Sequence, residues 1–139
     1  MSIDHAKHLA VRKKLQEHQV DPRVEALAHD VIARVADKWT MLILDVLAAH
    51  GALRFTQLSK LVPGISQKML TQTLRAMERE GLVIRTVYPV VPPKVEYHLT
   101  DLGLDLGEAF CGVWEWAEAN LDKIEAARAQ FDERLKAAE

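Results

Sequence analysis

The sequence has a single cysteine and no long apolar run, and these two shortages exclude several classes of protein. Cys111 is the only cysteine among 139 residues, so no internal disulfide can form and a reducing compartment is indicated. Apolar runs stop far short of the roughly 20 residues that a membrane helix needs. The N-terminus lacks a basic stretch followed by an apolar one, the pattern of a secretion signal. We therefore expect a cytoplasmic protein without a membrane segment.

Constellations typical of enzymes are also missing. The six histidines are scattered, and none stands with Cys111 or a carboxylate pair at the spacing of a catalytic or metal site. His5 and His8 could in principle bind a metal, but side chains so near a chain end are better explained as solvated. There is no glycine-rich phosphate loop and no serine in a nucleophile elbow. We expect no catalytic residue, no metal and no cofactor.

What the sequence does contain is one strongly patterned stretch, residues 66–80. Ser66 is a plausible N-cap after a Pro-Gly turn, and Gly81 suits the position just past a helix C-terminus. Three apolar residues at helical spacing are predicted to face the core: Leu70, Leu74 and Met77. The opposite face collects cations and hydrogen-bonding side chains without a carboxylate: Lys68, Thr71, Gln72, Arg75 and Arg79. Such side chains read base edges or hold phosphates, although a plain solvated helix face remains the alternative.

The charge distribution favours the first of these interpretations. The formal net charge is −2, which alone argues against nucleic-acid binding. Residues 53–99, however, hold seven lysines and arginines against three carboxylates, while residues 100–139 hold four against ten. A positive middle with an acidic C-terminal segment is typical of a DNA-facing module joined to an assembly element.

The elements around this stretch predict a winged helix-turn-helix. Helices are expected from Asp4 to about His18, from Asp21 to about Val35 and from Asp37 to Gly51, the last being the central core helix. A short β segment at 53–55 and a brief helix at 56–62 follow, the latter with Leu58, Leu61 and Val62 facing inward. After Gly81 the apolar period changes from 3.6 to 2, which predicts two strands around a proline-stiffened tip at 89–94. Residues 37–99 thus have the order of a winged helix.

From Thr100 the chain is predicted to be helical nearly to its end. A helix of that length would span roughly 58 Å at 1.5 Å per residue, too long to pack wholly on so small a domain. Either it breaks near Asn120, or it projects and pairs with a second subunit. We expect a homodimer whose contacts come from this helix and the first one: Leu9, Leu106, Phe110, Val113, Ala117, Leu121 and Ile124.

Several motifs together resemble the HxlR family of winged-helix transcriptional regulators. They are Asp37-Lys38-Trp39-Thr40, Arg54-Phe55, Gly64-Ile65-Ser66-Gln67-Lys68-Met69-Leu70-Thr71, Glu80-Gly81-Leu82-Val83 with Arg85, Tyr88-Pro89, Val91-Pro92-Pro93, Val95-Glu96-Tyr97, and Leu99-Thr100 with Gly103. The resemblance covers about residues 26–116. It implies a homodimer on an inverted repeat, with helix 66–80 in the major groove and wing 89–94 on the adjacent backbone or minor groove.

This resemblance gives the organisation of the chain and a set of DNA-binding residues. The fold class is mainly α with a small β-hairpin wing, as a single domain over residues 1–139: N-terminal helices at 1–36, the winged core at 37–99 and the C-terminal dimerisation helix or helices at 100–139. The expected DNA contacts are Arg54, Ser66, Gln67, Lys68, Thr71, Gln72, Arg75, Arg79, Arg85 and Lys94. Arg75 could pair with a guanine, and Arg85 and Lys94 are expected to neutralise phosphates.

The family's usual oxidation switch is not expected here. Several members carry a sensing cysteine near the start of the helix before the Lys-Trp motif, and residues 22–30 contain none. Cys111 lies between Glu108 and Glu115 without a nearby cation, a setting that disfavours the reactive thiolate. A small-molecule effector is the expected trigger, in a pocket near Trp39, Phe110 and Trp114. The alternative to a DNA-binding regulator is a winged helix used only for protein binding, which would make the 68/71/72/75/79 face apolar.

Overall fold

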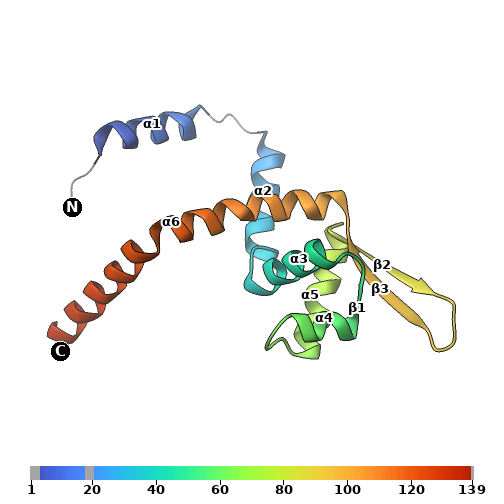
Figure 1. The fold of residues 1–139 in the computed structure, drawn as a ribbon. Coiled ribbons are helices and arrows are strands. Elements are labelled where there is room, and N and C mark those ends of the chain that lie inside the picture. Colours follow the sequence, from blue (N-terminus) through green and yellow to red (C-terminus); the bar gives the residue numbers. More distant parts are fainter. Residues whose placement is uncertain (1–3, 18–20, 139) are drawn as a thin grey trace. The chain divides into compact units, whose positions relative to one another are not determined.

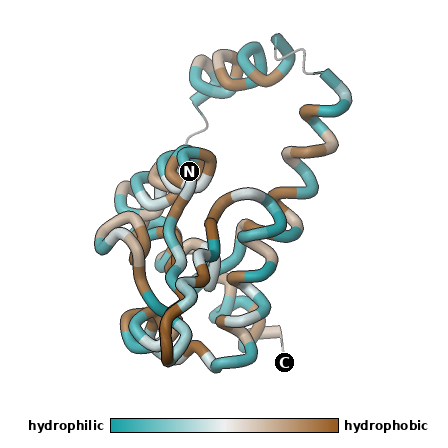
Figure 2. The backbone as a smooth tube through the Cα atoms, turned by 90° about the vertical axis from the view of Figure 1, so that its right-hand side faces the viewer, coloured by the Kyte–Doolittle hydropathy of each residue, from teal (hydrophilic) through white to brown (hydrophobic). Residues whose placement is uncertain are grey.

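The computed structural model describes residues 4–17 and 21–138 (Figure 1). The chain divides into two compact units, Met1–Ala36 and Asp37–Glu139. The first contains α1 (His5–Gln16) and α2 (Pro22–Arg34). Both helices begin after a capping aspartate: Asp4 accepts from the Lys7 N–H at 3.1 Å, and Asp21 accepts from the Arg23 N–H at 2.8 Å. Neither helix has a buried residue, and the brown apolar positions of Figure 2 alternate with teal ones along both.

The second unit is a winged helix followed by one long helix. Its elements are α3 (Lys38–His50), β1 (Leu53–Arg54), α4 (Phe55–Leu61), α5 (Gln67–Arg79), β2 (Val83–Tyr88), β3 (Lys94–Leu99) and α6 (Asp101–Ala138). This order confirms the predicted fold class, mainly helical with a small sheet. The division at residue 36 falls between the end of α2 and the start of α3 along the chain.

The core is built from the inner faces of α3, α4 and α5. Its largest fully buried side chains are Ile43, Leu44, Leu47, Leu58, Val62, Leu70, Leu74 and Met77. The central role of α3 and the inward face of α5 are as predicted. The prediction that Leu61 faces inward is wrong, because its side chain is 39% exposed. It is the last residue of α4, and Leu58 and Val62 already fill the inward positions on either side of it.

The sheet is antiparallel, with strand order β1-β3-β2. β1 is only two residues long, pairing Leu53 with Tyr97 and Arg54 with Glu96. The predicted β segment 53–55 is therefore one residue too long. Phe55 instead begins α4, where the Arg54 N–H donates to Gln57 Oε1 at 2.9 Å and fixes the first turn.

The register of β2 and β3 decides which face of the wing each side chain occupies. Arg85 pairs with Tyr97, Val87 with Val95 and Tyr88 with Lys94. Because successive residues of a strand alternate between faces, Arg85 and Tyr97 share one face while Tyr88, Lys94 and Glu96 share the other. The two expected phosphate contacts of the hairpin, Arg85 and Lys94, thus lie on opposite faces.

A tight joint connects the start of α6 to the end of α5. The Thr100 hydroxyl lies 2.6 Å from the Gly81 carbonyl oxygen and 3.1 Å from that of Leu82, and it accepts from the Gly103 N–H at 3.1 Å. A Cβ on Gly103 would overlap the Leu82 carbonyl oxygen. The absence of a side chain at Gly103 therefore sets how closely α6 approaches the residues that follow α5.

α6 is continuous over Asp101–Ala138, which settles the question of a break near Asn120. The Asn120 side chain donates to the Trp116 carbonyl oxygen at 2.8 Å, a contact inside one helical turn that does not interrupt the helix. At 1.5 Å per residue its 38 residues span roughly 57 Å. Only Gly103 is buried in it, and α6 contacts α3 and β3 near its beginning. Over the described residues, none of the helices is both long and apolar enough to cross a membrane.

Candidate nucleic-acid interface

α5 is the element around which the candidate site is arranged. It begins where predicted, since Ser66 Oγ accepts from the Met69 N–H at 3.0 Å. It ends where predicted too, because Gly81 has a φ of 76°, a left-handed conformation that glycine adopts without steric cost. Leu70, Leu74 and Met77 are buried on its inner side. The rest of the helix is left to solvent.

The predicted cationic face is on that solvent side. Lys68, Gln72, Arg75 and Arg79 are exposed, and Thr71 is half-buried. The Thr71 hydroxyl donates to the Gln67 carbonyl oxygen at 2.8 Å, so its proton is engaged within the helix and it could only accept from a ligand. This leaves Lys68 and Gln72 as the donors with the freest access near the N-terminal half of α5.

The cations of this face are not equally available. Arg79 is paired with Glu80, its Nη1 lying 2.8 Å from Oε1. Within residues 4–17 and 21–138, by contrast, no carboxylate oxygen lies within 4.0 Å of the charged nitrogens of Lys68, Arg75 or Arg85. None of these three is held in an ion pair, so their N–H donors are open to an anion.

Lys94, expected at the wing as a phosphate contact, is engaged in a small cluster. Its Nζ lies 2.9 Å from Glu96 Oε1 and 5.1 Å from the centroid of the Tyr88 ring. The Tyr88 hydroxyl lies 3.4 Å from Glu96 Oε2. Lys94 is the main reason that the pKa of the Glu96 carboxyl lies below its ordinary value of 4.5, with smaller contributions from Tyr88 and Arg54. The carboxylate therefore offsets the charge of Lys94 at neutral pH.

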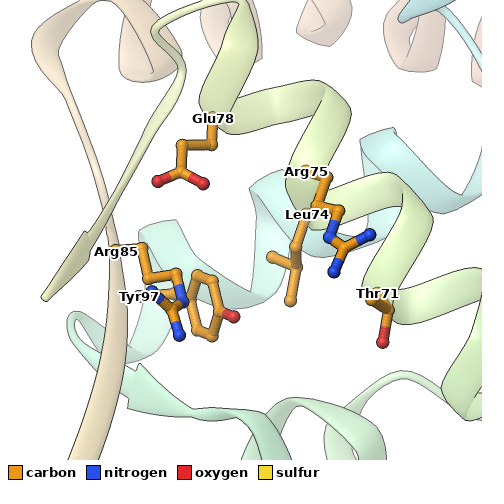
Figure 3. A pocket seen from close by; sticks show the side chains of 6 residues that line it. All are labelled: Thr71, Leu74, Arg75, Glu78, Arg85 and Tyr97. Atoms are coloured by element: carbon orange, nitrogen blue, oxygen red, sulfur yellow. The ribbon is translucent and has the colours of Figure 1, made fainter. Parts of the chain in front are cut away.

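Arg75 and Arg85 border the same cleft, between α5 and the wing (Figure 3). The cleft has a volume of about 390 Å³, and Thr71, Leu74, Arg75, Glu78, Arg85 and Tyr97 line it. Sequence reasoning had singled out both arginines but not their proximity, and it missed Glu78 and Tyr97. Alternation along each strand could have placed Tyr97 only if the register of the hairpin had been known.

The remaining expected DNA contacts lie around α5 and β1. Arg54 is exposed in β1, beside Glu96 in the register of the sheet. Ser66 and Gln67 are exposed at the N-terminus of α5, where free backbone N–H groups attract anions. The Ser66 side chain is already used for capping, so its contribution would be through the backbone.

The residues expected at the dimer contact occupy α1 and α6. Leu9, Val113 and Leu121 are exposed in the single chain, while the others are half-buried: Leu106, Phe110, Ala117 and Ile124. Trp114 and Trp116 of α6 are also exposed, at 50% and 59%. α6 thus presents a long apolar surface that its own unit leaves uncovered.

The expected effector residues lie on α3 and α6. Trp114 lines a groove of about 500 Å³ with Asp45, Cys111, Glu115 and Glu118. This groove adjoins a narrower cavity of about 190 Å³ between α3 and α6, since Asp45 and Cys111 line both. Trp39 and Phe110 line neither; Trp39 is half-buried, with the Lys38 ammonium 4.8 Å from its ring centroid.

Comparison with known proteins agrees with this geometry. Residues 34–125 match the family model described as HxlR-like helix-turn-helix. The HTH-type transcriptional regulator YtfH of Escherichia coli K12 is 42% identical over 107 residues, which cover 77% of this chain and 82% of that protein. The structure of the transcriptional regulator YtfH from Salmonella typhimurium has a TM-score of 0.63 at 40% identity, over 73% of this chain and 90% of that one.

The redox regulator HypR in its reduced form is similar as well. Its TM-score is 0.64 at 36% identity, over 71% of this chain and 97% of HypR. The family match, the YtfH relatives and the winged-helix geometry all agree with the motifs noted in the sequence. The chain therefore belongs to the HxlR-like helix-turn-helix family of transcriptional regulators.

Proposed function

We propose that this regulator binds double-stranded DNA sequence-specifically as a homodimer, with α5 of each protomer in a major groove. The observation that carries the proposal is the exposed face of α5, where Lys68 and Arg75 have no carboxylate partner among the described residues and Gln72 is free to donate. A helix used only for protein binding would present apolar side chains there. The wing would lie on the adjacent backbone or minor groove.

The decisive experiment is selection of bound fragments from the source genome, followed by fluorescence anisotropy with the selected sequence. We expect a site with inverted half-sites about one helical turn apart, roughly 34 Å. Gln72→Ala should weaken binding to that site more than binding to unrelated DNA. Lys123→Ala, which removes an exposed cation from α6, is the matched control and should leave both unchanged. Equal binding of all fragments by the wild type would refute sequence specificity.

The homodimer is supported by the apolar surface of α6. One winged helix makes too few contacts for the affinity of a typical specific site, and an isolated α6 cannot bury its apolar side chains. Leu121, 56% exposed, is the sharpest probe. Leu121→Asp should convert a dimer to a monomer in light scattering, whereas Asp122→Asn on the next position should not. A monomeric wild type at micromolar concentration would contradict the proposal.

The seam between α3 and α6 is the proposed place of a small-molecule effector. The 190 Å³ cavity has apolar walls that include Leu44, Leu99 and Leu104, and Trp114 stands in the adjoining groove. A ligand that holds α6 differently against α3 would also act on α5, because the Thr100 joint links the two. Compounds that quench tryptophan fluorescence in the wild type but not in Trp114→Phe, and that change DNA affinity, would identify such a ligand.

A further inference from the structure

We infer that the cleft between α5 and the wing is a phosphodiester site, in which Arg75 and Arg85 grip one backbone phosphate of the DNA. The inference rests on the proposed function and deepens it by assigning Arg75 to the backbone instead of to a base edge. It concerns the cleft of about 390 Å³ shown in Figure 3.

The two guanidinium groups come from elements that the fold holds together. Arg75 is on the outer face of α5, and Arg85 is on the face of β2 that the register shares with Tyr97. Contacts between α5 and β2 fix the distance between helix and strand, and all the lining residues belong to one compact unit. The backbone positions of the two residues are therefore set before DNA arrives, and binding has only their exposed side chains to order.

The side chains in the cleft have the chemistry of an oxyanion site. Both arginines lack a carboxylate partner within the described residues, and a guanidinium offers several N–H donors that match phosphate oxygens. The Tyr97 hydroxyl is a further possible donor. No base edge is required by this arrangement, because each guanidinium can direct one or two of its N–H donors to the oxygens of a phosphate.

Glu78 explains why a diester fits better than a free phosphate. It lines the same cleft, one helical turn after Arg75. Two guanidiniums and one carboxylate leave a single positive charge, which the one negative charge of a phosphodiester balances. A dianionic phosphate monoester would face Glu78 with its second charge, and like charges at short range repel.

In this arrangement the N-terminal half of α5 contacts bases and its C-terminal half contacts the DNA backbone. Recognition helices contact base edges mainly through residues of their N-terminal half, which here are Lys68 and Gln72. Arg75 lies on the third turn beside the wing. We call the joint contact of Arg75 and Arg85 with one phosphate the clamp. A clamp at this point would fix the depth and angle at which α5 enters the groove.

The first test is a double-mutant cycle read through salt dependence. A neutralised phosphate contributes about 0.9 to the slope of log affinity against log salt. If both arginines hold one phosphate, then Arg75→Ala, Arg85→Ala and the double variant should each lower the slope by at most about 0.9 per half-site. Each single variant should weaken binding about 10-fold, and the double variant by far less than the 100-fold that independent contacts would give. Slopes that add to about 1.8 would overturn the clamp.

The second test replaces single phosphates of the selected site with neutral methylphosphonates. One linkage in each half-site should weaken the wild type about as much as the double substitution does, and should cost the double variant nothing further. Lys123→Ala is the control and should respond as the wild type does. Circular dichroism and thermal melting of every variant confirm that it is folded.

The outcomes separate the clamp from the function on which it rests. If Arg75→Ala loses discrimination at one base pair while keeping its salt slope, Arg75 reads a base and the clamp is wrong, although the regulator still binds DNA. If the wild type prefers no sequence, the proposed function itself fails. Inorganic phosphate at constant ionic strength should not compete with DNA more than chloride does; strong competition would make the cleft a site for a free anion.

Discussion

Replacing Gly103 by alanine tests the joint that connects α6 to the recognition helix. A Cβ at this position would overlap the Leu82 carbonyl oxygen and lie 3.1 Å from Leu99 Cδ2. The carbonyl is part of the backbone and cannot rotate away as a side chain would. It also accepts from the Thr100 N–H at 3.0 Å, so any displacement disturbs a second contact of the joint.

The sign of the effect follows from two opposing magnitudes. Alanine in place of glycine inside a helix gains up to about 1 kcal/mol of helix propensity. Overpacking a closed site costs about 1–3 kcal/mol, and here the obstacle is rigid. We expect a net loss of about 1–2 kcal/mol in the free energy of unfolding. At a urea m-value of about 2 kcal/mol per M, the midpoint would fall by about 0.5–1 M.

The same helix supplies a matched control. Gly112 has no atom within 4 Å of where a Cβ would stand, so Gly112→Ala keeps the propensity gain without the collision. It should raise the free energy of unfolding by up to about 1 kcal/mol. All variants are unfolded in urea at one protomer concentration, because the proposed dimerisation would make stability depend on concentration. A Gly103→Ala protein as stable as the wild type would show that the joint is loose and refute the reasoning.

Three smaller predictions concern the cap of α5 and the wing. Ser66→Ala removes the oxygen that accepts from the Met69 N–H, and it should lower the free energy of unfolding by about 1 kcal/mol in thermal melts. Because the pKa of Glu96 is lower in the folded state, its pairing stabilises the fold above pH 4.5 and is lost as the pH falls through the folded pKa. Glu96→Gln should therefore be less stable than the wild type at pH 7, with the difference decreasing as the pH falls through the folded pKa; a difference that does not decrease in acid would contradict this. Lys94→Ala should lower the salt slope of DNA binding less than Arg85→Ala does, since Glu96 already offsets its charge.

Local signals in the sequence were sufficient to predict most of the fold. The ends of α3 and α5 were identified from single residues whose side chain or backbone suits a helix end, as with Asp37, whose carboxylate accepts from the Thr40 N–H at 2.8 Å. The hairpin was predicted from another local signal, the change of the apolar period from 3.6 to 2 after Gly81. The errors were confined to element ends such as Phe55 and Leu61, where propensity is weak and one tertiary contact decides.

The sequence predicted which residues belong to the candidate site, but not which of them lie together or form ion pairs. The cationic row on α5 follows from helical spacing alone, and the structure places it on the exposed side. Ion pairs are different, because they depend on rotamers and on neighbours from other strands. Helical spacing would favour a pair between Arg75 and Glu78, three residues apart, yet the structure pairs Arg79 with the adjacent Glu80 and leaves Arg75 without a carboxylate partner among the described residues.

The pairing register of β2 and β3 in the wing could not be predicted from local sequence signals. Residues 89–93 between the strands do not determine how the strands pair, and a shift of one residue in β3 would move every one of its side chains to the other face. With Arg85 opposite Tyr97, Arg85 faces the cleft beside α5 and Lys94 joins Tyr88 and Glu96 on the far side. With the register shifted by one, Lys94 would stand on the face of Arg85, and Tyr97 would leave the cleft. Strand alternation was visible in the sequence, yet only the pairing decides which cation can act together with the recognition helix.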